Sequence, residues 1–240
     1  MRVLLWVGFV FGAVLGAVLG VVAIFWVSLI RGKRAVHADG VLCRAEVTGG
    51  SPLDGPALVR LSGAFAPENT TGHDVLGLAL RCQKRAVDDA ADGDQDLLLG
   101  SFESFRTAEH DKGTTDAGDY LNNLYSSVTP WLYPQRGPIT FHIGPLAPAP
   151  PRDRGADRDA RLDADLAADR ARLALRAGTP TTPGDVLAEI RLIAKLPIDQ
   201  RALHESMFRT GRGVRPRGIR NGIRATVYPI SQLARSLRGG

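Results

Sequence analysis

Cysteines and aromatic residues are scarce in this sequence, and both shortages narrow the possible folds. Its 240 residues include two cysteines, and aromatic residues make up 6% of the chain. Two thiols cannot build a disulfide-dependent fold or a zinc site with four thiolate ligands. The hydrophobic content of 44% still suffices for a buried core and excludes a wholly disordered chain. We therefore expect one domain, with room for an appendage, whose core rests on Val, Leu, Ala and Ile.

Charged residues are absent from the N-terminal segment between Val3 and Ile30. About 20 apolar residues suffice to cross a bilayer, whereas the apolar part of a signal peptide is shorter, about 7–15 residues. Trp6 and Trp26 stand near the two ends of the run, as interfacial aromatics do. The run predicts a single uncleaved transmembrane helix, so that residues 1–32 form an anchor and residues 33–240 a separate domain.

Two further features of this segment bear on its orientation and assembly. Arg2 precedes the apolar run and three basic residues follow it closely, so the positive-inside rule places the following domain in the cytoplasm. Glycine recurs at every fourth position, a spacing that permits close helix approach. This spacing fits a homodimer, and equally a lone helix in lipid; the glycines concerned are Gly12, Gly16 and Gly20.

Acidic residues are absent after Glu205, whereas arginines continue to recur. Such a basic tail can contact anionic lipid or nucleic acid. With an apolar run at the other end of the chain, we expect the lipid bilayer as the partner, and no nucleic acid.

Hydrophobic patterning in the rest of the chain predicts mostly strands. Residues 41–47, 57–61 and 75–82 are apolar segments bounded by turns, and residues 185–196 alternate between apolar and polar side chains. Residues 88–96 predict an acidic hairpin tip and residues 107–119 a polar loop. The segment 121–133 is helical or irregular, and 157–176 predicts a solvated amphipathic helix. The pattern indicates a β-rich core with helices added later in the chain.

Three stretches, in this order, resemble the haem-binding signatures of the catalase family. The segment from Arg34 to Gly40 is similar to the family's Arg-x-x-His-Ala-x-Gly, with His37 at the distal histidine. Residues 59–62 are similar to Val-Arg-Phe-Ser, and residues 74–79, which follow, to Asp-x-Arg-Gly-Phe-Ala. Residues 224–229 are similar to the proximal Arg-x-x-x-Tyr-Pro. The resemblance implies an α+β fold in which the transmembrane helix is followed by a catalase-like antiparallel β-barrel with added helices.

On the proximal side, the resemblance implies a haem b whose iron is bound by Tyr228, because tyrosine is the iron ligand in catalases. A neutral phenol is a poor ligand, and a nearby cation favours the phenolate. Arg224 stands four residues earlier, so on a helix it can reach the phenolic oxygen. Other arginines match positions that bind the haem propionates, where guanidinium pairs with carboxylate in a fork; they are Arg34, Arg60 and Arg235.

On the distal side, the resemblance implies that His37 is the acid–base group and that the Ser62 hydroxyl fixes its orientation. Catalases carry an asparagine after an Asp-Leu-x-Gly stretch, and here Ser101 stands at that position with one residue inserted. A hydroxyl is shorter than an amide and holds peroxide less firmly. We therefore expect a peroxidase or organic hydroperoxide activity rather than efficient disproportionation of hydrogen peroxide.

Two other functions fit parts of the sequence. A metal-dependent phosphohydrolase would use the pairs His73-Asp74 and His110-Asp111 together with His142 and His204, because histidine and aspartate bind divalent metals. None of these residues has the tight spacing of a zinc protease. The other alternative is a non-catalytic, membrane-anchored binding domain.

Overall fold

A computed structural model of the chain describes most of its residues. The described ranges are 2–19, 25–26, 37, 40–64, 74–102, 107–147, 157–179, 181–197 and 204–237. The side chains of Tyr228 and Arg235 lie outside this description, although the backbone of both belongs to a described helix.

Antiparallel strands dominate the described part of the chain. They form one ten-stranded sheet in the order β10-β6-β7-β5-β4-β3-β2-β1-β9-β8, and an additional pairing of β7 with β8 closes eight of the strands into a barrel. The strands are β1 (Gly40–Thr48), β2 (Gly55–Gly63), β3 (Leu76–Cys82), β4 (Gln95–Gly100), β5 (Tyr125–Ser126), β6 (Trp131–Tyr133), β7 (Gly137–Pro145), β8 (Arg172–Gly178), β9 (Val186–Lys195) and β10 (Arg215–Pro216).

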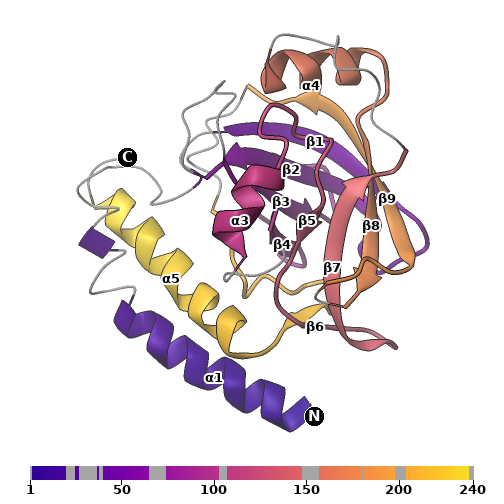
Figure 1. Ribbon diagram of the computed structural model, residues 1–240. Coiled ribbons are helices and arrows are strands. Elements are labelled where there is room, and N and C mark those ends of the chain that lie inside the picture. Colours follow the sequence, from indigo (N-terminus) through magenta and orange to yellow (C-terminus); the bar gives the residue numbers. More distant parts are fainter. Residues whose placement is uncertain are drawn as a thin grey trace.

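Helices lie outside this barrel. α4 covers its upper end as drawn in Figure 1, and α1 and α5 lie side by side on the flank away from β8 and β9. The helices are α1 (Arg2–Leu19), α3 (Ala108–Thr114), α4 (Arg158–Ala167) and α5 (Ile219–Ser236).

The core fills the barrel with aliphatic side chains and a few large aromatic ones. Leu61, Leu78 and Leu97 come from adjacent strands and are almost fully buried, and Trp131 and Phe141 pack edge to face at 6.0 Å. Residues of β4 are buried on both faces of the strand, because the barrel interior covers one face and other segments cover the outside. The core is therefore built mainly from Leu, Val and Ala, as the low aromatic content predicts.

Several sequence-based predictions of secondary structure are confirmed. The strands expected at 41–47, 57–61, 75–82 and 185–196 are β1, β2, β3 and β9. The expected acidic hairpin connects β3 to β4, and Gly93 at its tip has a φ of 89°. Glycine adopts this left-handed conformation without a steric penalty.

Other predictions are wrong in part. The segment 107–119 contains α3 where a loop was expected, and 121–133 contributes the short strands β5 and β6. The helix expected over 157–176 ends at Ala167, after which Asp169 (φ 53°) turns the chain into β8. Burial of Leu173, Ala174 and Leu175 in the barrel outweighs the helical composition of that stretch.

The N-terminal segment differs from the expected membrane span. α1 ends at Leu19, and no helix among the described residues is long and apolar enough to cross a membrane. The expected helix over residues 3–30 is therefore not found, although most of its second half lies outside the described residues. Instead, the glycine face of α1 packs on α5: a Cβ at Gly12 would lie 1.9 Å from the Ile219 carbonyl oxygen, and one at Gly16 2.6 Å from Cα of Ile223. This face, whose spacing fitted either a homodimer or a lone helix in lipid, is filled by the same chain at Gly12 and Gly16; Gly20 lies outside the described residues.

Candidate functional site

A histidine and a serine from separate segments meet at one rim of the barrel. The Oγ of Ser62, near the end of β2, lies 3.1 Å from Nδ1 of His37, which precedes β1. Ser62 is buried and His37 is half-buried. The imidazole is thus held at one nitrogen by a neutral hydroxyl, an arrangement that fixes the ring and leaves a proton-transfer group at the surface of the barrel.

The backbone of His37 is fixed as tightly as its ring. Arg60, which is almost fully buried, donates from Nη2 to the carbonyl oxygen of His37 at 2.7 Å, and the His37 N–H donates to Ala64 O at 3.2 Å. His37 has a φ of 57°, in the left-handed region that costs a non-glycine residue about 1–3 kcal/mol. The surrounding hydrogen bonds hold the residue in this conformation. Arg60 thus supports the backbone of the histidine, and its expected contact with a haem propionate stays a prediction.

Space for the imidazole comes from a glycine in β3. A Cβ at Gly77 would lie 2.5 Å from Cε1 and 2.6 Å from Nδ1 of His37, closer than real Cβ contacts allow. Gly77 is paired with Ser62 across β2 and β3. This one residue pair therefore provides both the hydroxyl that contacts His37 and the space that its ring occupies. Sequence reasoning included Gly77 in a matched stretch but did not give it this role.

Ser101 has a different set of partners. Its Oγ accepts a hydrogen bond from Leu76 N at 2.9 Å and lies 2.9 Å from Oγ1 of Thr115, which follows α3. These contacts join the ends of β3 and β4 to α3. The structure therefore places Ser101 near the strand that carries Gly77, with its hydroxyl engaged in holding these elements together.

Ser101 also lines a cavity that has a volume of about 180 Å³. His142 of β7 lies in the same wall, and its Nε2 is 2.8 Å from the Thr179 carbonyl oxygen. Asp111, Thr115 and Asn123 add polar atoms. The cavity is a second polar space, and His37 is not among its lining residues. Composition and spacing gave no sign of this cavity, because its walls come from β4, α3, β5 and β7.

Helix α5, which carries Tyr228, is attached to the barrel by Arg224. The guanidinium donates to Leu98 O of β4 at 2.9 Å and to Ser127 O at 3.2 Å. Thr129 Oγ1 donates to Oδ1 of Asn221 at 2.7 Å, one turn earlier on the same face. These contacts place the start of the 224–229 motif against the barrel. The expected contact between Arg224 and the Tyr228 oxygen, and the sites of Arg34 and Arg235, lie outside the described side chains and residues.

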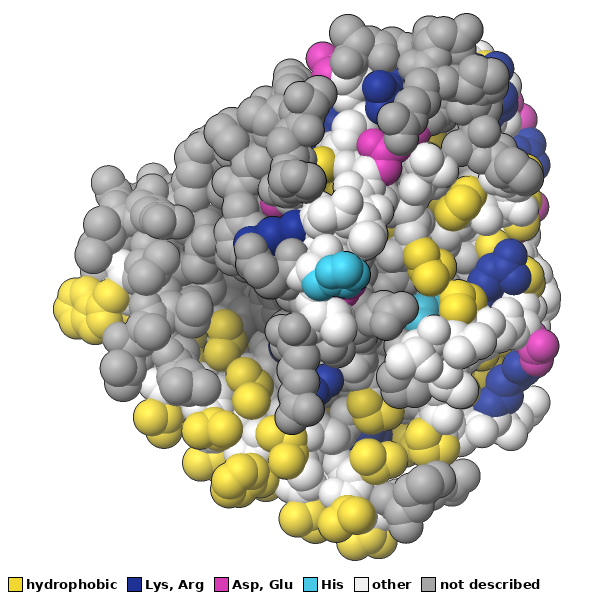
Figure 2. Space-filling model, viewed as in Figure 1, with side chains coloured by type: hydrophobic (Ala, Val, Ile, Leu, Met, Phe, Trp, Pro, Cys, Tyr) yellow, Lys and Arg dark blue, Asp and Glu magenta, His cyan; other side chains and the backbone are white. Residues whose placement is uncertain are grey.

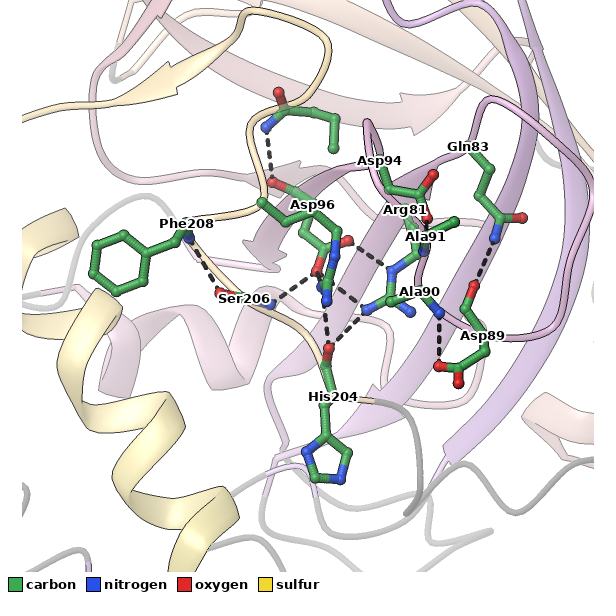
Figure 3. Close-up of polar contacts among 12 residues, drawn as sticks. Arg81, Gln83, Asp89, Ala90, Ala91, Asp94, Asp96, His204, Ser206 and Phe208 are labelled. Carbon is green, nitrogen blue, oxygen red and sulfur yellow. Dashed lines mark hydrogen bonds and ion pairs between the residues drawn. The ribbon is translucent and has the colours of Figure 1, made fainter.

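A buried ion-pair network fixes the segment that leads to α5. Asp96 accepts hydrogen bonds from Arg81 Nε at 2.8 Å and from Ser206 N at 2.8 Å (Figure 3). It also accepts one from the Arg209 guanidinium. Arg81 and Arg209 also donate to His204 O. The arginines on either side of Asp96 thus tie residues 204–209 to strands β3 and β4. This network is structural: it orients the chain before β10 and α5.

The described positions of the histidine and aspartate residues do not support the metal-dependent phosphohydrolase alternative. Among the described residues no group of three or more His, Cys, Asp or Glu side chains could hold a metal ion. His142 is in the cavity wall and His204 takes part in the ion-pair network through its carbonyl, while His73 lies outside the described residues. The described members of these His-Asp pairs therefore form no such group, and the pair that includes His73 is not tested.

Comparison with solved structures identifies a similar fold. A fungal catalase matches with a TM-score of 0.55 at 11% sequence identity, over 85% of this chain and 59% of the catalase. No protein-family profile and no curated protein matches the sequence. At this identity the match shows the fold alone, and the chain spans less than two thirds of the catalase. The chain is a catalase-like antiparallel β-barrel with added helices.

Proposed function

We propose that the protein is a haem-dependent peroxidase or hydroperoxide-metabolising enzyme. The observation that carries the proposal is the 3.1 Å contact between Ser62 Oγ and His37 Nδ1, in a barrel whose fold is catalase-like. The donor set fits haem b: a half-buried imidazole with a fixed ring, and a helix bearing Tyr228 that the barrel holds in place through Arg224. Tyr228 would bind the iron, and arginines, Arg34 and Arg235 among them, would pair with the propionates.

The roles of the protein side chains follow from their chemistry. Haem supplies an iron centre at which the O–O bond of a peroxide can be broken. His37 takes the proton from the peroxide oxygen and returns it to the departing oxygen, while Ser62 keeps the imidazole in one orientation. Arg224 donates only to neutral carbonyls in its described contacts, so its positive charge stays available to favour a phenolate one helical turn away. Reduction of a hydroperoxide to an alcohol and water also consumes two electrons from an external donor and two protons from that donor or from solvent.

The position of Ser101 supports a peroxidase more than a fast catalase. Its hydroxyl already contacts Leu76 N and Thr115 Oγ1, so it is poorly placed to replace a distal amide that holds hydrogen peroxide. Organic hydroperoxides are accordingly the proposed substrate class.

The test is haem binding by the full chain, expressed with haem supplied. We expect a Soret band that Tyr228→Phe abolishes, while Tyr133→Phe, a matched change of a buried barrel tyrosine, keeps it. His37→Gln should retain haem and lose turnover of cumene hydroperoxide. A wild-type protein without a Soret band would overturn the proposal, and an unchanged spectrum in Tyr228→Phe would overturn the assignment of the iron ligand.

A further inference from the structure

The outward side of α1 is apolar along its described length. Hydrophobic side chains gather on the lower left of the molecule in Figure 2, the place of α1 in Figure 1. Single exposed apolar residues are ordinary, but a continuous patch indicates an interface with protein or membrane. The exposed side chains of this outer face are Val3, Leu4, Trp6, Val7, Val10, Phe11, Val14, Leu15 and Val18.

The opposite side of α1 packs against α5, and this contact fixes the orientation of α1 on the molecule. A Cβ at Gly222 would be 2.0 Å from Phe9 O, so the two helix backbones are in direct contact, and Gly218 N donates to Leu5 O at 3.0 Å. Gly12 approaches Ile219 and Gly16 approaches Ile223 and Thr226, so the two helices run in the same direction. α1 is therefore attached along its length to α5.

α5 is attached in turn to the barrel. Arg224 reaches Leu98 O and Ser127 O, and Asn221 Nδ2 donates to Pro130 O at 2.9 Å. An 18-residue helix is about 27 Å long, short of the roughly 30 Å of the hydrocarbon core. A membrane crossing by α1 in this arrangement would carry α5 and its polar barrel contacts into lipid, where unsatisfied polar groups are costly. The helix pair fits a membrane only when it lies parallel to the surface.

Positive charge borders the apolar face at the start of α5. Arg215 and Arg220 are exposed, and Arg217 lies between them, close to the N-terminal half of α1. Burial lowers the pKa of the Arg217 guanidinium, and the positive charge of Arg215 lowers that pKa further. Anionic lipid head groups would relieve this crowding of like charge. A second copy would bring the same arginines together in a two-fold interface and add to the repulsion.

We infer that α1 and the start of α5 form an in-plane membrane-binding face. The outer side chains of α1 enter the outer part of one leaflet, and Arg215, Arg217 and Arg220 contact anionic head groups. The partner is thus a lipid surface with negative charge. This inference does not depend on haem binding, because it uses only the outer surface of the helix pair.

Depth measurement separates this arrangement from a membrane crossing. Single cysteines at Val3→Cys, Phe11→Cys and Val18→Cys would carry a fluorescent label in the full chain reconstituted in vesicles; native Cys43 and Cys82 are buried. Lipids brominated near the head group should quench all three labels to a similar extent. A control label at Val186→Cys, exposed on β9, should not be quenched. A crossing helix would bury Phe11→Cys deepest, and a face covered by a second copy would shield all three labels from lipid; either result overturns the inference.

Charge dependence tests the arginine border. Binding to vesicles that contain phosphatidylglycerol should exceed binding to neutral phosphatidylcholine vesicles. Arg215→Glu/Arg220→Glu should reduce binding to the phosphatidylglycerol vesicles by about thirtyfold or more. The matched variant Lys84→Glu/Arg85→Glu, on the exposed loop after β3, should bind like the wild type. Equal binding to both vesicle types, or an equal loss in both variants, would overturn the role given to these arginines.

Discussion

Ser62 Oγ lies 3.1 Å from Nδ1 of His37, although 25 positions separate the two residues in the chain. The contact exists because β1 and β2 pair with Gly40 opposite Ser62, which brings the residues before β1 to the end of β2. A single backbone register therefore decides whether the histidine has an orienting partner.

Removal of the Ser62 hydroxyl tests this partnership. Ser62→Ala should shift the equilibrium between the two imidazole tautomers of His37, since one hydrogen bond contributes about 1 kcal/mol. Nitrogen NMR of labelled histidine would measure the tautomer, and the rate of the haem protein with cumene hydroperoxide should fall about fivefold. Ser126→Ala removes a comparable buried hydroxyl, which accepts from Val128 N. A His37 spectrum identical in Ser62→Ala and wild type would contradict the contact.

A methyl group at Gly77 should displace the imidazole. The added Cβ would lie 2.5 Å from His37 Cε1, so Gly77→Ala should lower the unfolding free energy by about 1–3 kcal/mol and reduce peroxide turnover about tenfold or more. Gly113→Ala in α3 is the matched control, because nothing lies within 4 Å of its Cβ. Urea unfolding and hydroperoxide kinetics measure both effects. Unchanged turnover in Gly77→Ala would show that the ring position does not govern the reaction.

Disruption of the buried Asp96 network should weaken the whole fold. Asp96→Asn leaves Arg81, whose side chain is 3% exposed, without its charged partner, and such losses cost about 3–5 kcal/mol. The control Asp88→Asn breaks an exposed ion pair with Arg44 and should cost less than about 1 kcal/mol. Chemical denaturation compares the two variants. Similar stability of both would mean that the buried network contributes no more than a surface pair.

Alkaline pH should destabilise the protein through its buried thiols. Burial raises the pKa of the Cys43 thiol to about 12, against an opposing effect of Lys195. The unfolded thiol, with a pKa of about 8.5, releases its proton first, so the stability gained from the neutral thiol is complete below that pH and is lost as pH rises toward 12.

Between pH 7.5 and 9.5 this single thiol should lower the unfolding free energy by about 1.4 kcal/mol. Urea unfolding under reducing conditions at both pH values measures the difference, and Cys43→Ala should show a decrease smaller by that amount. The same decrease in variant and wild type would indicate that Cys43 is accessible or already ionised in the folded protein.

The strands that the sequence predicted correctly depend on local patterns. β1, β2, β3 and β9 are bounded by turn residues, and β9 alternates between apolar and polar residues, signals contained within a few neighbouring positions. The order of His37, Ser62 and Tyr228 along the chain likewise indicates a catalase-like fold from the sequence alone. Composition alone also predicted an aliphatic core.

Only the tertiary structure determines the contacts between residues that lie far apart in the sequence. The glycines of α1 permit close approach to any helix, and only the position of α5 determined that Ile219 and Ile223 fill this face. The room that Gly77 leaves for His37, and the carbonyls that hold Arg224, come from strands brought together by barrel closure. A sequence pattern shows which residues are able to make such contacts. Which residue becomes the contact partner depends on the strand register and on closure of the barrel. Both are set together by burial of the whole core.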